Sequence, residues 1–93
     1  MFNHSNNLSK ELTIRNELGL HARPAAQIAK IAQNAKSRVW LLKDEDTADA
    51  SSIIDLLSMA CVSGSKIIIQ VEDGSDLEIL EAIAELVEAG FGE

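Results

Sequence analysis

The spacing of apolar residues changes repeatedly along this chain, and the order of those changes restricts its fold more than any other feature. Residues Leu8 to Arg15 alternate apolar and polar side chains, with Leu12 and Ile14 on one face, which predicts a half-buried strand. From Ala22 the apolar residues recur at helical spacing, and this predicts an amphipathic helix that ends near residues 34–36. The first two elements are therefore a strand and a helix.

The middle of the chain predicts a hairpin and a short helix. Ser37 to Lys43 is rich in Val, Trp and Leu, and polar residues 44–46 separate it from a short strand at Thr47 to Ala50. Ser51 or Ser52 can cap a helix that follows. The apolar residues of that helix recur at three and four positions and are Ile53, Leu56, Leu57 and Ala60.

The last part of the chain predicts one more strand and one more helix. Lys66 to Glu72 alternates and directs Ile67, Ile69 and Val71 inward. Ser75 and Glu78 match a capping box for the last helix, and Gly90 can end it. The apolar stripe expected to be buried comprises Leu77, Leu80, Ile83, Ala84 and Val87.

The predicted order is strand, helix, strand, strand, helix, strand, helix within 93 residues. A chain of this length has room for one core, so we expect a single domain over residues 1–93 with residues 1–7 frayed. The economical arrangement is an α+β open-faced sandwich, in which three helices cover one face of a four-stranded antiparallel sheet.

Charge and composition exclude several function classes. The net charge of −7 and the low aromatic content of 3% argue against nucleic-acid binding, and no apolar run approaches the length of a membrane span. The charge is uneven, however, because residues 1–43 hold seven of the eight Lys and Arg residues. Cys61 is the only cysteine and is expected in the core, which agrees with a reducing compartment. We therefore expect a cytoplasmic protein without membrane insertion.

A lone histidine, His21, lies at the predicted start of the first helix. The free N–H groups of Ala22 and Arg23 and the positive end of the helix dipole favour a bound anion there, and Pro24 lacks an N–H that would go unused. One nitrogen of a neutral imidazole can attack phosphorus while the other carries the proton. This placement favours a phosphohistidine with Arg23 as charge partner, although a plain surface or capping histidine is the alternative.

The string Gly19-Leu20-His21-Ala22-Arg23-Pro24-Ala25 resembles the phosphorylation-site signature of HPr, the histidine phosphocarrier of the bacterial phosphoenolpyruvate-dependent phosphotransferase system. The resemblance extends from Leu8 to Val87. It implies that enzyme I phosphorylates His21 on Nδ1, that Arg23 balances the charge of the phosphate, and that a histidine of an enzyme IIA domain receives the group. It also implies a monomeric, stoichiometric carrier without a cofactor rather than a true catalyst.

The same resemblance assigns roles to the short helix. Ser52 corresponds to a regulatory site that a dedicated serine kinase/phosphorylase modifies in some lineages, whereas the alternative from the residues alone is a helix N-cap. The helix carries more apolar surface than one face of a short helix can bury, on Ile53, Ile54 and Leu57. In the resembled family this helix forms a partner-docking patch. The alternative is that all three belong to the core.

Two alternative functions involve the same residues. The acidic segment from Glu72 to Glu93 resembles the nitrogen-related NPr branch of the family, which leaves open a regulatory module that acts mainly by docking, with His21 phosphorylation secondary. A metal or hydrolytic site would have to use His21 with His4 or Cys61. No His or Cys spacing suits a metal, so we predict no metal site.

Overall fold

The computed structural model describes residues 8–93, and its elements follow the predicted order. They are β1 (Ser9–Thr13), α1 (Ala22–Ala32), β2 (Val39–Lys43), β3 (Asp46–Asp49), α2 (Ile53–Ser58), β4 (Lys66–Val71), η2 (Gly74–Asp76), α3 (Leu77–Glu88) and η3 (Gly90–Gly92). Most bounds differ from the predicted ones by one to four residues. The expectation for residues 1–7 lies outside the described residues, and no helix within residues 8–93 is long and apolar enough to cross a bilayer.

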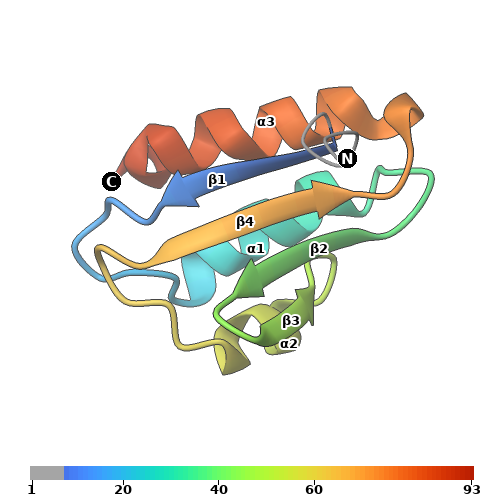
Figure 1. Cartoon of the computed structure of the whole chain (residues 1–93). Coiled ribbons are helices and arrows are strands. Elements are labelled where there is room, and N and C mark those ends of the chain that lie inside the picture. Colours follow the sequence, from blue (N-terminus) through green and yellow to red (C-terminus); the bar gives the residue numbers. More distant parts are fainter. Residues whose placement is uncertain (1–7) are drawn as a thin grey trace.

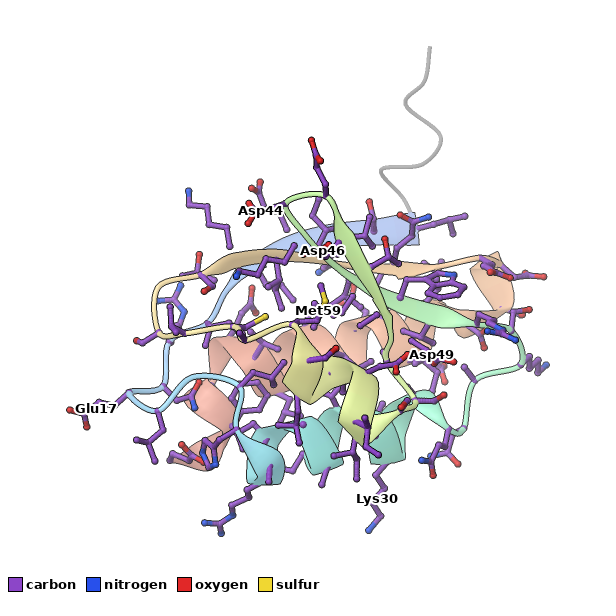
Figure 2. All side chains as sticks on the ribbon, turned by 90° about the horizontal axis from the view of Figure 1, so that it is seen from below. Glu17, Lys30, Asp44, Asp46, Asp49 and Met59 are labelled. Carbon is purple, nitrogen blue, oxygen red and sulfur yellow. The ribbon has the colours of Figure 1, made fainter. Side chains whose placement is uncertain are left out.

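The strands form one four-stranded sheet in the order β1-β4-β2-β3, and every neighbouring pair is antiparallel. Helices α1, α2 and α3 form a second layer on one side of this sheet (Figures 1 and 2), which leaves the other face open. The predicted α+β open-faced sandwich is confirmed. Its central strands β4 and β2 are paired on both edges, because each lies between two other strands.

The core lies between the sheet and the helices. Strand β4 buries Ile67, Ile69 and Val71, as its alternation predicts. The buried side chains of α1 are Pro24, Ala25, Ile28, Ala29 and Ala32. The buried side chains of α3 are Leu80, Ile83, Ala84 and Val87. The spacing of apolar residues in each of these segments therefore predicted its buried face correctly over most of its length.

The start of α3 differs from the prediction. The predicted buried residue Leu77 is 40% exposed, and the residue before it, Asp76, is only 2% exposed. The Asp76 carboxylate accepts hydrogen bonds from the N–H groups of Lys36 and Ser37, both at 2.9 Å. This contact turns Asp76 inward, and Leu77, the next residue along the helix, is rotated away from the core.

The predicted capping box of Ser75 and Glu78 is also wrong. The side chain of Asp73 accepts a hydrogen bond from the Ser75 N–H and begins the short turn η2, and Asp76 is the N-cap residue of α3 without a side-chain cap bond. Asp residues compete well for nearby backbone N–H groups. Here that local bond inserted an extra turn before the helix.

Helix α2 begins as predicted but buries less than predicted. Ser52 is its N-cap, and its side-chain oxygen accepts a hydrogen bond from the Asp55 N–H at 3.2 Å. Leu56 is the buried residue of the helix, whereas Ile53 and Leu57 are each 39% exposed. A helix of six residues has one short face to bury, so the remaining apolar side chains meet solvent.

Candidate functional site

His21 is the N-cap residue of α1, and its ring is free of any capping role. Its backbone is extended, with φ −92° and ψ −169°, and its side chain makes no cap hydrogen bond. The first helical hydrogen bond runs from the Ala25 N–H to the His21 carbonyl at 3.0 Å. The His21 side chain is 34% exposed, so the imidazole is accessible to solvent at the mouth of the helix.

A tight backbone approach before the helix sets the position of His21. Gly19 has a φ of +69°, and a Cβ on it would lie 2.5 Å from the Cys61 carbonyl oxygen. The next residue, Leu20, is buried and donates its N–H to that same carbonyl at 2.8 Å. Glycine is therefore required here both for its left-handed backbone and for the space it leaves.

The start of α1 offers unused donors and a positive charge. Ala22 and Arg23 precede the first helical hydrogen bond, so their N–H groups have no acceptor within the helix, and Pro24 has no N–H to satisfy. Arg23 is exposed and forms no ion pair with any residue from 8 to 93. The structure thus brings His21, Ala22 and Arg23 together, in an arrangement that favours a bound anion.

Two residues at the site were missed by the sequence reasoning. They are Glu93 and Asn16. Glu93 Oε2 lies 2.9 Å from His21 Nε2, and the other carboxylate oxygen, Oε1, accepts a hydrogen bond from Asn16 Nδ2 at 3.1 Å. Figure 1 shows why: the end of the chain marked C lies beside the end of β1 and the loop that leads to α1. No local pattern could reveal these contacts, because the partners are 72 and 77 residues apart.

Cys61 approaches the site through its backbone rather than its thiol. Its side chain is buried in the core, as predicted, and burial raises the pKa of the Cys61 thiol. No cluster of three or more His, Cys, Asp and Glu side chains suited to a metal ion occurs between residues 8 and 93. His4, the other histidine weighed for a metal site, lies outside the described residues.

Helix α2 exposes apolar side chains next to α1. Ile54 is 78% exposed, and Ile53 and Leu57 are each 39% exposed, so the alternative that all three are core residues is wrong. Near the end of α1, Gln33 Nε2 donates a hydrogen bond to the Ser51 carbonyl at the start of α2. The segment after α2 leads to Cys61, which contacts Leu20 beside His21. Helix α2 therefore runs antiparallel to α1, with its end toward the histidine.

Two further exposed apolar residues lie in the loops around His21. Leu18 precedes the histidine and is 73% exposed, and Val62 follows Cys61 and is 66% exposed. Their loops are close, because a Cβ on Gly19 would lie 3.0 Å from the Val62 Cα. We call Leu18, Ile53, Ile54, Leu57 and Val62 the apolar surface set. Residues of this kind on a small domain are typical of a protein-binding face.

Known proteins resemble this chain in sequence and in fold. Residues 8–89 match the family model described as the PTS HPr component phosphorylation site. The chain is 38% identical over 87 residues to phosphocarrier protein NPr of Klebsiella oxytoca and 31% identical over 86 residues to phosphocarrier protein HPr of Neisseria meningitidis, each alignment covering 92% of this chain and 97% of the relative. The crystal structure of HPr from Thermoanaerobacter tengcongensis superposes with a TM-score of 0.86 at 33% identity, covering 91% of this chain and 96% of that one. The chain therefore belongs to the HPr family of phosphocarrier proteins of the phosphotransferase system.

Proposed function

We propose that this chain accepts a phosphoryl group from phosphorylated enzyme I on Nδ1 of His21 and passes it to a histidine of an enzyme IIA domain, in the cytoplasm. The observation that carries the proposal is the environment of the two ring nitrogens. Nε2 of His21 is engaged by the Glu93 carboxylate at 2.9 Å, which leaves Nδ1 as the nitrogen open to a phosphoryl donor. The membership in the HPr family supports the same chemistry.

The start of α1 suits a phosphoryl group that must be held and then released. The N–H groups of Ala22 and Arg23, the helix dipole and the Arg23 guanidinium all favour the added negative charge. Each helix-end contact is worth about 0.3–1 kcal/mol. Stabilisation of this size leaves the phosphoryl group transferable to the next histidine.

The apolar surface set gives the proposal a docking face. Its residues lie on α2 and on the loops around His21, and the exposed cations Arg23 and Lys30 lie on the neighbouring helix α1. Figure 2 shows the Lys30 side chain projecting away from the sheet. We infer that enzyme I and enzyme IIA meet this face with apolar surface surrounded by acidic groups, because opposite charges steer association.

The direct test is phosphorylation of the purified protein. Wild type incubated with enzyme I and phosphoenolpyruvate is expected to gain the mass of one phosphoryl group, and acid treatment is expected to remove it. His21→Ala is expected to gain none, whereas the control His4→Ala, which changes the other histidine of the chain, is expected to behave as wild type. Intact-mass spectrometry measures all three.

Two results would contradict the proposal. An adduct that persists in His21→Ala would place the phosphoryl group elsewhere. A wild-type protein that binds enzyme I or an enzyme IIA domain but takes up no phosphoryl group would instead be a regulatory module that acts by docking.

A further inference from the structure

We propose that Asn16 is a positioning residue for phosphoryl transfer: its side-chain amide holds the Gly19 carbonyl and thereby fixes the backbone that presents His21. This inference rests on the proposed phosphorylation of His21 and adds a residue of the preceding loop to that site. Asn16 lies in the loop between β1 and α1 and is only 6% exposed. A buried polar side chain in a short loop is expected to have a specific partner, and here the partner is the backbone of Gly19.

The Asn16 amide makes its contacts within residues 8–93 through its nitrogen. Nδ2 donates to the Gly19 carbonyl at 2.6 Å and to Glu93 Oε1 at 3.1 Å. Both partners are acceptors, and an amide turned round would place its oxygen against them, which defines the orientation of the group. The amide oxygen is buried and accepts no hydrogen bond from residues 8–93. Loss of the nitrogen therefore removes both side-chain hydrogen bonds of Asn16.

The peptide group between Gly19 and Leu20 is held at both ends. Its carbonyl accepts hydrogen bonds from Asn16 Nδ2 and from the His21 N–H at 3.0 Å, and its N–H donates to the Cys61 carbonyl at 2.8 Å. Gly19 has a φ of +69°, and glycine has more backbone freedom than any other residue. The Asn16 side chain thus restrains the peptide group that follows the most permissive residue of the loop.

This peptide group leads directly into His21. His21 is the N-cap residue of α1, so the position of its ring relative to the free N–H groups of Ala22 and Arg23 depends on the backbone just before it. A phosphoryl group on the ring must lie near those N–H groups to benefit from the start of the helix. Asn16 therefore acts on the histidine through the backbone and not through the ring.

The test compares Asn16→Leu with Asn34→Leu. Leucine keeps the size and branching of asparagine and lacks the Nδ2 donor. Asn34 is a matched control, because its Nδ2 also donates to a backbone carbonyl, that of Lys30 at 3.3 Å, near the other end of α1. Single-turnover rapid-quench experiments with phosphorylated enzyme I, at a series of carrier concentrations, give the limiting rate of transfer and the half-saturating concentration. Urea denaturation establishes that each variant is folded.

Asn16→Leu is expected to lower the limiting rate about tenfold, since displacement of a reacting group by about 1 Å can cost on the order of 100-fold. Its half-saturating concentration is expected to change less than about twofold, because the apolar surface set is intact and a loss of orientation alone does not weaken docking. Asn34→Leu is expected to change neither quantity. An unchanged limiting rate in Asn16→Leu, or a loss that lies in the half-saturating concentration, would overturn the inference.

Asn16→Ala removes the same nitrogen and adds no bulk, which covers the case in which Asn16→Leu does not fold. A folded Asn16→Ala with the limiting rate of wild type would overturn the inference. If neither variant folded, Asn16 would have a role in stability alone, and the inference would again be wrong.

The contact of Asn16 with Glu93 is tested separately. Glu93→Ala removes the acceptor Oε1 and leaves the Gly19 carbonyl in place. Asn16→Leu is expected to slow the Glu93→Ala protein as much as it slows wild type, within about twofold, because independent effects are additive. An effect of Asn16→Leu that vanishes in the Glu93→Ala protein would show that Asn16 acts through Glu93, and would overturn the inference. Failure of the proposed function is a distinct result, because wild type would then take up no phosphoryl group on His21.

Discussion

At the scale of single residues, one of the two ring nitrogens of His21, Nε2, has a partner in the fold. The Nε2 atom meets a carboxylate from the end of the described chain, and the backbone of the same residue begins α1. A histidine at a helix start is a common surface residue, and its position alone assigns neither nitrogen a role. The contact of Nε2 with Glu93 is what distinguishes the two ring nitrogens.

Gly19 is the residue whose backbone positions the histidine, and Gly19→Ala tests it. The substitution is expected to lower the free energy of unfolding by about 2 kcal/mol, because a side chain at positive φ is strained and its Cβ would clash with the Cys61 carbonyl. Urea denaturation measures the loss. Gly74→Ala is the control, since its Cβ meets nothing within 4 Å, and a change there as large as at Gly19 would contradict the explanation.

Asp49 makes stability depend on pH in the acidic range. Hydrogen bonds from the Ser51 hydroxyl at 2.7 Å and the Ser51 N–H at 2.9 Å, helped by the charge of Arg38, lower the pKa of the Asp49 carboxyl in the folded state. A folded-state pKa below the unfolded one stabilises the fold above the ordinary aspartate pKa of about 3.9. That stabilisation is lost as the pH falls through the lower folded value.

Asp49→Asn is therefore expected to be less stable than wild type near neutral pH and to lose less stability on acidification. Denaturation midpoints over a pH series from neutral to strongly acidic measure the difference. The control is Asp46→Asn in the same hairpin, because Asp46 is exposed and its side chain has no hydrogen bond or ion pair within residues 8–93. A parallel pH dependence of Asp49→Asn and wild type would refute this assignment.

At the scale of elements, the contact of Asp76 joins the end of α1 to the start of α3. The Lys36 and Ser37 N–H groups lie between α1 and β2, and the buried Asp76 carboxylate accepts hydrogen bonds from both. Asp76→Ala is expected to lower the free energy of unfolding by about 3 kcal/mol, since it removes two hydrogen bonds to a charged group and each such bond is worth roughly 1.5–3 kcal/mol. Chemical denaturation measures the loss.

The matched control is Asp73→Ala, three residues earlier. Asp73 is exposed and its side chain accepts a hydrogen bond from the Ser75 N–H within the short turn η2, so the loss on its removal is expected to be clearly smaller. Equal losses for the two variants would mean that local capping, rather than the junction between α1 and α3, accounts for the role of Asp76.

Comparison of α1 and β4 with the start of α3 shows which features of an element the sequence predicts. The spacing of apolar residues predicted α1 and β4 and their buried faces, because a helix or strand must bury one face against a core. The predicted Ser75 cap failed, since Asp73 competes for the Ser75 N–H and the distant Lys36 and Ser37 N–H groups engage Asp76. The contact of Asp76 with Lys36, 40 residues away, has no local signature in the sequence.

At the scale of the whole molecule, charge is divided between the basic residues 1–43 and the acidic remainder. For the proposed transfer, the division raises the question whether Arg23 would act by local pairing with a phosphoryl group on His21 or by general attraction of the partner. Arg23 and Lys30 are both exposed on α1, and Arg23 lies in its first turn beside His21. A comparison of variants at Arg23 and Lys30 therefore separates a local electrostatic effect from a general one.

Arg23→Glu is expected to slow phosphorylation by enzyme I about tenfold, because a hydrogen bond to a charged group is worth roughly 1.5–3 kcal/mol. Lys30→Glu is expected to slow it less than about threefold, as an exposed charge contributes about 0–1 kcal/mol. Initial rates of phosphoryl uptake at low and high salt measure both. Equal effects that disappear together at high salt would show that general steering dominates.

The sequence by itself determined the order of strands and helices, the open-faced sandwich and the position of His21 at a helix start. These follow from apolar spacing and turn residues, which act over a few neighbouring positions. Only the tertiary structure decided the contacts of Asp76 with Lys36 and Ser37 and of Glu93 with His21 and Asn16. Those contacts depend on how the layers pack, because packing brings together side chains that the sequence holds far apart.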